Sequence, residues 1–375
     1  MNVIYADHAA TTPLEPQAMQ AMQQAWQDYA NPAALYRAGL HAKQTVEKAR
    51  MAMAECLGCS PNQIFFTSGG SEGNTWAVFS MAQQERSGSR EVVTTPIEHH
   101  SVLGACDAQR RYGIASSRLP VDALGRVDAA ALEQAAARRP RLVSIQYANN
   151  EVGTIQDIPK LAEICHAQGV PLHVDAVQAA GHLALPIKSV DLLTASAHKF
   201  GGPKGIGFLY AKNPGCLRPL IYGGTQQHGL RPGTEPAPLI AGMAAAFRVT
   251  CAEREERAQR KRAMAAEFCE TLLAGWPQAR LHSTPDGLPG IVSVGLPGFS
   301  GQQLTYELDI AGVCVSPGAA CDNTGEQQPS HVLLALGGIA EQDALSTLRF
   351  SFGSANQPGD GREAAQRLLN VLKKY

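Results

Sequence analysis

Residues 191–205 read Asp-Leu-Leu-Thr-Ala-Ser-Ala-His-Lys-Phe-Gly-Gly-Pro-Lys-Gly, an apolar run that leads into a glycine-rich turn. The apolar run predicts a buried strand, and Lys199 lies just beyond its end. Open α/β sheets bind ligands outside the carboxyl ends of their strands, so this lysine stands where a ligand is expected. Burial disfavours the charged form of a lysine and makes its amine a good Schiff-base nucleophile. The alternative is a lysine in an exposed loop, the usual environment of this residue.

Strand-like and helical stretches alternate on both sides of this segment. In the first two-thirds of the chain we expect strands near residues 64–67, 91–95, 141–146, 171–174, 191–195 and 205–210. The helices expected between them lie near residues 71–86, 99–112, 128–138 and 157–168. Alternation of this kind predicts an α/β fold with crossover connections and a mostly parallel sheet that has helices on both faces.

The chain has 375 residues, which is more than one ordinary domain core, so we expect two lobes. A long helical stretch near residues 236–274 is predicted to connect the first lobe to the second. The second lobe is expected to hold shorter strands near 290–294 and 348–351, and helices near 301–311 and 359–373.

Composition narrows the class of protein. A hydrophobic fraction of 45% and a charged fraction of 17% are typical of soluble globular chains, and the net charge of −1 gives no basic stripe for direct nucleic-acid binding. The first residues do not resemble a signal peptide, and no run of about 18 apolar residues predicts a membrane span. Nine cysteines without a secretory signal suit reduced thiols in the cytoplasm. Cys56 and Cys59 lack the second ligand pair that zinc needs, and Gly58 between them predicts a helix end, so no metal is expected.

Two further motifs precede Lys199. Asp175 ends a predicted buried strand, where an acid is costly without a cationic partner. A pyridinium nitrogen would be such a partner, and an aspartate together with a Schiff-base lysine is what pyridoxal phosphate needs. The alternative for Asp175 is a helix N-cap. Residues 67–74 form a glycine-rich turn between a strand and a helix, where free N–H groups and the helix dipole favour an anion such as the cofactor phosphate.

These motifs, with others in order along nearly the whole chain, resemble cysteine desulfurases of the NifS/IscS type, which are fold-type-I pyridoxal-phosphate enzymes. The matching motifs are Asp7–Pro13, Asn31–Pro32, Thr67–Asn74, Glu98–His99, Asn149–Gly153, His173–Gln178, Ser196–Gly205, Leu230–Thr234, Gly318–Cys321, Pro329–Leu333 and Arg349–Gly353. The resemblance implies a large domain over residues 14–255 with a mostly parallel seven-stranded sheet. It also implies a smaller α+β domain, formed by residues 1–13 and 256–375, that carries a catalytic cysteine.

The resemblance implies roles for residues around the cofactor, pyridoxal 5'-phosphate. Lys199 would form the Schiff base and later move protons, and Asp175 would pair with the pyridinium nitrogen. His99 would stack on the ring and act as an acid or a base, and Gln178 would bond the ring oxygen. The phosphate would be bound by Gly70, Ser71, Ser196 and His198, and by Thr234 of the neighbouring subunit in a homodimer.

The resemblance also implies how the substrate, L-cysteine, is handled. Asn150 and Arg349 would bind its carboxylate, for which a planar guanidinium is well suited. Cys321 would take the sulfur as a persulfide, releasing L-alanine, and pass it to an acceptor protein. Cys321 stands in a polar, glycine-bearing stretch expected to be a mobile loop, where a reactive thiolate finds access. Cys314 stands in a strand-like apolar run and is expected in the core.

The sequence also leaves other functions possible. A selenocysteine lyase, a cystine C–S lyase or an aminotransferase on the same fold would not need Cys321, and a non-enzymatic scaffold for sulfur transfer would need no intact site. The acceptor could serve iron–sulfur assembly, tRNA thiolation, thio-cofactor synthesis or DNA phosphorothioation. Tyr36 stands where the family usually has histidine, and His228 stands where it has an arginine near the phosphate. Housekeeping members carry a longer C-terminal tail that engages an iron–sulfur scaffold, which puts that partner in doubt here.

Overall fold

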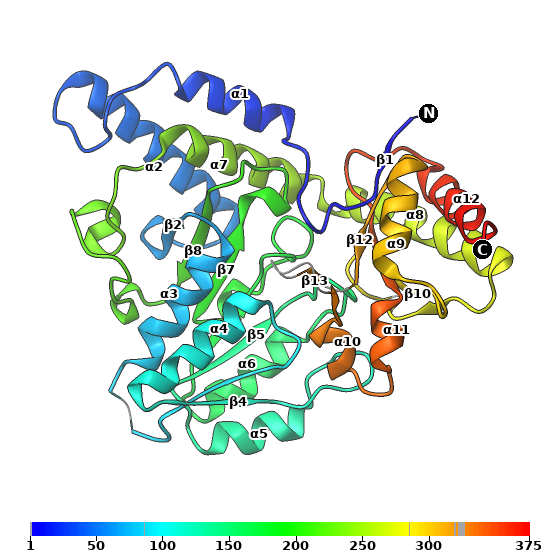
Figure 1. The fold of residues 1–375 in the computed structure, drawn as a ribbon. Coiled ribbons are helices and arrows are strands. Elements are labelled where there is room, and N and C mark those ends of the chain that lie inside the picture. The colour runs from blue at the N-terminus through cyan, green and yellow to red at the C-terminus, as the bar shows by residue number, and fades with distance from the viewer. Residues whose placement is uncertain (1, 86, 285, 319, 322–326) are drawn as a thin grey trace.

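A seven-stranded sheet forms the centre of the larger part of the molecule (Figure 1). The computed structural model describes the whole chain except residues 1, 86, 285, 319 and 322–326, and it describes only the backbone of residues 320, 321 and 327. The strands follow the order β2-β8-β7-β6-β5-β3-β4. Their bounds are β2 Ile64–Thr67, β3 Glu91–Thr94, β4 Ala115–Arg118, β5 Leu142–Gln146, β6 Leu172–Asp175, β7 Leu192–Ser196 and β8 Gly207–Ala211. Only β8 runs antiparallel to its neighbours within this sheet, so the mostly parallel seven-stranded sheet is confirmed.

Helices cover both faces of this sheet, as Figure 1 shows. Successive strand residues therefore point into two different apolar clusters: Phe66 and Val93 join one, whereas Phe65 and Val92 join the other. The first cluster is completed by α1 Pro16–Ala25, α2 Arg37–Leu57, α5 Ala129–Ala137, α6 Ile158–Ala167 and α7 Ala237–Ala252. The second is completed by α3 Gly70–Ala82 and α4 His100–Ala108. We call the two clusters together the sheet core.

Strand β4 was not among the predicted strands. Its sequence Ala-Ser-Ser-Arg carries no apolar run, and it pairs only with β3 at the edge of the sheet. An edge strand with little burial has no strong hydrophobic pattern, so the sequence gives little signal there.

A separate apolar cluster, which we call the C-terminal core, gathers the end of the chain and its beginning. Ile4 and Ala6 pack there with Phe268 and Phe350. Its strands are β1 Ile4–Tyr5, β9 Arg280–Leu281, β10 Ile291–Gly295, β11 Val313–Cys314, β12 Ser316–Pro317 and β15 Thr347–Ser351, and its helices are α8 Arg254–Gly275, α9 Gly301–Ile310 and α12 Asp360–Leu372. The remaining elements are β13 Ala320–Cys321, β14 Gln327–Gln328, α10 His331–Ala335 and α11 Glu341–Leu345. The division into domains at residues 13/14 and 255/256 stays a prediction.

The predicted helix over residues 236–274 is wrong in one respect, because it is two helices. Helix α7 ends at Ala252, and α8 begins at Arg254 after Glu253, whose backbone departs from helical geometry at φ −98° and ψ 9°. Met243 of α7 packs in the sheet core, whereas Phe268 of α8 packs in the C-terminal core. Because of this break, α7 can pack in the sheet core while α8 packs in the C-terminal core. No helix in the described part of the chain is long and apolar enough to span a membrane.

Candidate active site

A cavity of about 390 Å³ lies where β6 and β7 end and α3 begins. Its walls bring together all but two of the predicted site residues, from both the sheet core and β15. The lining residues are Ala9, Ala10, Gly70, Ser71, Asn74, His99, Ser101, Gln146, Asn150, Asp175, Val177, Gln178, Ser196, His198, Lys199 and Arg349. The volume is that of an ordinary small-molecule site.

Lys199 ends the short 3₁₀ turn Ala197–Lys199, directly after β7. Its Nζ donates to the carbonyl oxygens of Ala9 and Ala10, each at 2.7 Å. Burial lowers the pKa of this amine to about 8, and the nearby Arg349 guanidinium acts in the same direction. A substantial fraction of the amine is therefore neutral near physiological pH, as a Schiff-base nucleophile requires.

Asp175 is the last residue of β6 and is only 1% exposed. Its Oδ2 accepts from Asn74 Nδ2 at 2.7 Å, and its Oδ1 accepts from the Val177 N–H at 2.9 Å. Burial raises the pKa of this carboxyl above its ordinary value, although these hydrogen bonds and His99 oppose the rise. A carboxylate in this position is stabilised most by a cation within the cavity. The alternative of a simple helix N-cap is not what the structure shows, because no helix begins at Asp175.

The glycine-rich turn at the start of α3 faces the same cavity. A Cβ added at Gly70 would lie 2.7 Å from Val177 Cγ2, so the turn packs closely against the segment after Asp175. Glu72 fixes the turn from the outside, because it accepts from the Ser68 N–H at 2.7 Å and from Arg231 at 2.9 and 3.1 Å. The helix N-terminus offers free N–H groups, and Ser71, Ser196 and His198 surround it. This arrangement suits an anion such as a phosphate.

These three features together fit pyridoxal phosphate. The buried carboxylate of Asp175 suits the ring nitrogen, the amine of Lys199 suits the aldehyde, and the α3 N-terminus suits the phosphate. All three groups line one cavity of about 390 Å³. The residues present therefore meet the chemical requirements of this cofactor.

His99 and Gln178 also reach the cavity. His99 caps α4, with its Nδ1 accepting from the Ser101 N–H at 3.1 Å, and burial lowers the pKa of its ring, which favours the neutral form. Gln178 is buried, and its Nε2 donates to the Ala9 carbonyl at 2.8 Å. An amide nitrogen carries two N–H bonds, so one remains for a ligand oxygen.

Arg349 lines the same cavity from β15 and is 9% exposed. Its Nη2 donates to Asp7 Oδ1 at 2.8 Å and to Ser316 Oγ at 3.0 Å, and its Nη1 donates to the Asn150 carbonyl at 3.2 Å. Its Nε is buried and has no partner among the described residues. The guanidinium is thus held in place with donor capacity left for a ligand, although its pairing with Asp7 also fits a purely structural role.

Two predicted residues do not line this cavity. Cys321 lies in β13, whose backbone pairs with β14 as Cys321 opposite Gln327, and its side chain lies outside the described part of the structure. Thr234 is exposed in the segment before α7. Its predicted contact with a neighbouring subunit stays a prediction.

The expectation that Cys314 is a core residue is wrong. Its neighbours Val313 and Val315 point into the C-terminal core, so alternation along the strand turns Cys314 to the other side, where it is half-buried. Burial still raises the pKa of its thiol above the ordinary value, and the carboxylates of Asp309 and Asp7 raise it further. A raised pKa makes this thiol a poorer nucleophile, independently of access.

Asn74 and Gln146 line the cavity and Asp7 binds Arg349, but none of the three had a predicted role. Gln146 could have been identified as a polar residue ending a buried strand, and Asn74 as one turn beyond Gly70 on the same face of α3. Gln146 Nε2 donates to Asn150 Oδ1 at 3.3 Å and so supports a predicted substrate residue. The pairing of Asp7 with Arg349 spans 342 positions and leaves no local signal.

Comparison with known proteins agrees with this geometry. The family described as aminotransferase class-V matches residues 4–360. The "Putative cysteine desulfurase IscS 1" of Bacillus subtilis (strain 168) is 36% identical over 378 residues, with 100% of both chains covered. A cysteine desulfurase of Cereibacter sphaeroides is 38% identical, covering 99% of this chain and 95% of that protein.

Solved structures of similar proteins also match this chain over most of its length. A NifS-like protein is 32% identical with a TM-score of 0.92, and both chains are covered fully. SspA in complex with cysteine is 31% identical with a TM-score of 0.80, covering 93% of this chain and 99% of that one. With a family match over residues 4–360 and full-length relatives that are named cysteine desulfurases, this chain belongs to the class-V aminotransferase family.

Proposed function

We propose that this protein takes sulfur from L-cysteine, releases L-alanine, and holds the sulfur as a persulfide on Cys321 until an acceptor protein removes it. Its family depends on pyridoxal 5'-phosphate, and its full-length relatives are named cysteine desulfurases. The observation that carries the proposal is the cavity that Asp175, Lys199 and Arg349 line together. An amino acid bound by its carboxylate at Arg349 would have its α carbon near Lys199. The complex of a 31% identical structure, SspA, with cysteine also supports this substrate.

When bound, pyridoxal phosphate supplies an electron sink beside the α carbon of an amino acid. The residues that would hold it are Asp175 at the ring nitrogen, Gln178 at the ring oxygen, His99 over the ring, Lys199 at the aldehyde carbon, and Gly70, Ser71, Ser196 and His198 at the phosphate. Asn150 and Arg349 would orient the substrate carboxylate, and the freed amine of Lys199 would then move the α proton.

Sulfur transfer itself falls to Cys321. Its thiolate would attack the sulfur of L-cysteine, forming an S–S bond while the carbon–sulfur bond breaks. The electron pair of the broken bond goes to carbon, which takes up a proton and leaves as alanine. The terminal sulfur of the resulting persulfide then passes to the acceptor. No external oxidant is needed, because one S–S bond and one C–H bond replace one C–S bond and one S–H bond.

Two thiol variants test this assignment. Cys321→Ser should still bind L-cysteine, seen as a change in the cofactor absorption spectrum, yet release no sulfide with dithiothreitol. Cys314→Ser is the matched control, seven positions earlier and half-buried, and should keep most of the turnover. An active Cys321→Ser together with an inactive Cys314→Ser would show that the wrong thiol was chosen. A selenocysteine lyase would turn over without either thiol.

A homodimer with shared active sites is part of the proposal. Large apolar side chains are exposed on residues 26–36, with Tyr29 at 93% and Leu35 at 92%, and Tyr222 is 86% exposed. Exposed apolar residues in such number are typical of a subunit interface. Thr234 is exposed close in sequence to Tyr222 and would reach the partner's phosphate. Sedimentation should give a dimer, and a fully active monomer would disprove this part.

The acceptor and its pathway stay open among iron–sulfur assembly, tRNA thiolation, thio-cofactor synthesis and DNA phosphorothioation. The cysteines that the structure describes form no disulfides with one another, and a cytoplasmic location is part of the proposal. Incubating the persulfide form with candidate acceptors and following the labelled sulfur would identify the partner.

A further inference from the structure

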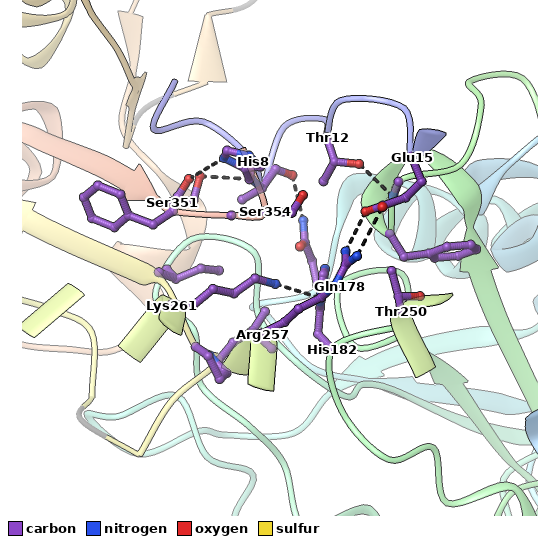
Figure 2. A pocket seen from close by; sticks show the side chains of 18 residues that line it. His8, Thr12, Glu15, Gln178, His182, Thr250, Arg257, Lys261, Ser351 and Ser354 are labelled. Carbon is purple, nitrogen blue, oxygen red and sulfur yellow. Dashed lines mark hydrogen bonds and ion pairs between the residues drawn. The ribbon is translucent and has the colours of Figure 1, made fainter. Parts of the chain in front are cut away.

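A second, much smaller cavity of about 30 Å³ borders the turn that carries Lys199 (Figure 2). It shares Ala9 and Gln178 with the active-site cavity, so the two are neighbours. Side chains from α8 enter it, among them Arg257 and Lys261, and they meet His182 from the loop after β6. None of these three residues has a part in the proposed chemistry.

A chain of two hydrogen bonds runs from α8 to the backbone of Lys199. Lys261 Nζ lies 3.0 Å from His182 Nδ1, and His182 Nε2 lies 2.9 Å from the carbonyl oxygen of Lys199. A carbonyl oxygen only accepts, so Nε2 must carry the hydrogen, and Nδ1 must then accept from the Lys261 ammonium. Lys261 thereby selects the one neutral tautomer of His182 that can donate to Lys199.

The charge state of the pair agrees with this assignment. Burial, reinforced by Lys261, holds the pKa of His182 well below its ordinary value, so the ring is neutral. Lys261 is only 8% exposed, and burial lowers its pKa to about 8. The other charged and titratable groups around the cavity are His8, Glu15 and Arg257. Of these, Glu15 is already bound by Arg257 at 2.5 and 3.1 Å, and Lys261 is bonded to His182 instead.

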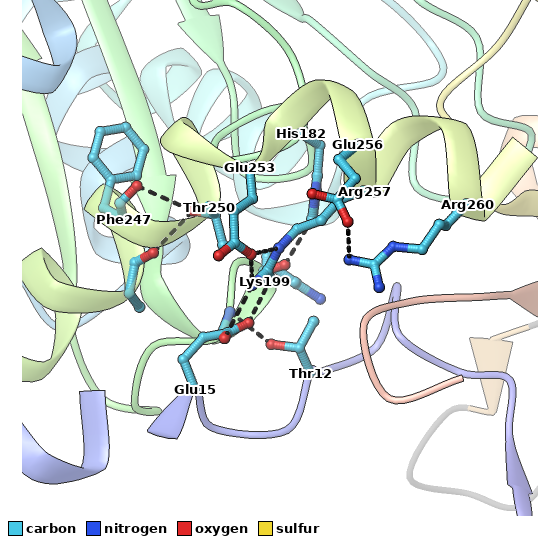
Figure 3. Close-up of polar contacts among 12 residues, drawn as sticks. Thr12, Glu15, His182, Lys199, Phe247, Thr250, Glu253, Glu256, Arg257 and Arg260 are labelled. Carbon is cyan, nitrogen blue, oxygen red and sulfur yellow. Dashed lines mark hydrogen bonds and ion pairs between the residues drawn. The ribbon is translucent and has the colours of Figure 1, made fainter. Parts of the chain in front are cut away.

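Helix α8 is linked to the Lys199 turn a second time, through Arg257 and Glu15 (Figure 3). Arg257 lies one turn before Lys261 and holds Glu15, whose own N–H donates to the Gly201 carbonyl at 2.8 Å. Residues 199 and 201 are therefore both tied to the same helix. The far end of α8 packs in the C-terminal core with Phe268, the core to which the β15 strand of Arg349 also contributes.

We propose that His182 and Lys261 are positioning residues for Lys199, holding its backbone so that the amine keeps its direction while the C-terminal core supplies Arg349. This inference rests on the proposed function. Neither residue would contact cofactor or substrate. The competing explanation is that the pair only stabilises the packing of α8 on the sheet core.

Removing His182 separates the two explanations. His182→Leu removes both hydrogen bonds but no charge, because the ring is neutral. On the proposal, the pH midpoint of the lysine-bound cofactor absorption band shifts, and kcat/KM for L-cysteine falls by up to about tenfold, the size of one neutral hydrogen bond. His182→Gln should restore both, because its amide offers an N–H for Lys199 and an oxygen for Lys261. Pure packing would lower Tm and leave the midpoint and kcat/KM unchanged.

Lys261→Met is a second test, which stays informative even if His182→Leu does not fold. It should reproduce the loss in kcat/KM, whereas the matched control Arg260→Met should behave as wild type. Arg260 is the preceding residue on α8, pairs with Glu256 at 3.4 Å and is 59% exposed. Because both positions act through one carbonyl, the double variant His182→Leu/Lys261→Met should be no worse than His182→Leu alone.

The opposite results would overturn the inference. Losses that multiply in the double variant, or an effect of Arg260→Met equal to that of Lys261→Met, would show that no shared relay exists. A wild-type protein without any lysine-bound cofactor band would instead disprove the proposed function. The band is measured in the absence of substrate, so the two failures are distinguishable.

Discussion

The residues expected to hold the cofactor and those expected to bind the substrate, here called the cofactor end and the substrate end of the cavity, are held in place differently. At the cofactor end, Asp175 ends β6 and Lys199 follows the adjacent parallel strand β7, so the sheet sets the position of both backbones. At the substrate end, Arg349 is placed by side-chain contacts with Asp7 and Ser316, which lie 342 and 33 positions away. The sheet thus sets the backbone of the cofactor end, where contacts such as that of the Lys199 amine with the Ala9 and Ala10 carbonyls only orient the side chain. The substrate end depends on polar contacts between distant segments for its guanidinium as a whole. Substitutions at the cofactor end should therefore abolish sulfide release, whereas substitutions at the substrate end should lower activity only by degrees.

The largest effect is expected from Lys199→Ala. Without the amine no covalent link to the cofactor can form, so borohydride reduction followed by mass spectrometry should find no cofactor attached, and sulfide release should be lost. Lys204→Ala is the control, because Lys204 stands five positions later in the same glycine-rich turn and is exposed. Reduced cofactor found on any other lysine would refute the assignment.

The same contrast explains what could be predicted from sequence. Strand ends, glycine-rich turns and the acid before the lysine are local patterns, so the cofactor end and the parallel sheet were predictable from short motifs. The resemblance to a known family added the roles of His99, Gln178, Ser196 and His198 at the cofactor end. It also added those of Asn150, Arg349, Cys321 and Thr234. What has no local pattern was missed: the polar edge strand β4, the break at Glu253, and the side of β11 on which Cys314 lies.

Contacts between distant segments were also not predicted from the sequence. Lys261 and His182 are 79 positions apart, and Asp7 and Arg349 are 342 apart. Each residue alone is an ordinary polar side chain, and only the folded chain decides its partner. Both ends therefore needed the structure to identify their side-chain partners, whereas the backbone positions at the cofactor end followed from local patterns.

A graded effect is expected from Arg349→Ala. A charged hydrogen bond to a carboxylate is typically worth about 1.5–3 kcal/mol, which corresponds to a rise in KM for L-cysteine of roughly ten- to a hundredfold. Cofactor content should be unchanged. Arg349→Lys should not restore KM, because a point charge cannot reproduce the planar guanidinium that also holds Asp7 and Ser316.

Arg280→Ala is the matched control for this experiment. Arg280 lies on β9 of the same sheet and also pairs with an aspartate, Asp343, at 2.6 Å, but it is 58% exposed. Its loss should leave KM unchanged. If Arg349→Ala lowers only Tm and leaves KM as it was, the pairing of Arg349 with Asp7 is structural and the substrate end has been misassigned.

The smallest effect on turnover is expected at Glu98, a fully buried acid next to His99. Its Oε1 accepts from Thr95 Oγ1 at 2.7 Å and from the Gln146 N–H at 2.8 Å, while its Oε2 has no partner among the described residues. Burial raises the pKa of this carboxyl to about 8, from 4.5 for a free side chain. Glu98 therefore tests whether the cofactor end tolerates a charge directly beside His99.

The sign of the pH effect follows from the raised pKa. Below pH 4.5 the carboxyl is protonated in both folded and unfolded chains, and its contribution to stability is fully present. Between 4.5 and about 8 only the unfolded chain ionises, so this contribution declines as the pH rises, and above about 8 it is lost. Glu98→Gln cannot ionise and should escape the decline. Chemical denaturation should show the variant gaining roughly 1–3 kcal/mol on wild type between pH 5 and 8, with KM nearly unchanged. The exposed Glu133→Gln should show no such gain, and a gain for Glu98→Gln that is equal at both pH values would mean that Glu98 stays ionised in the folded protein.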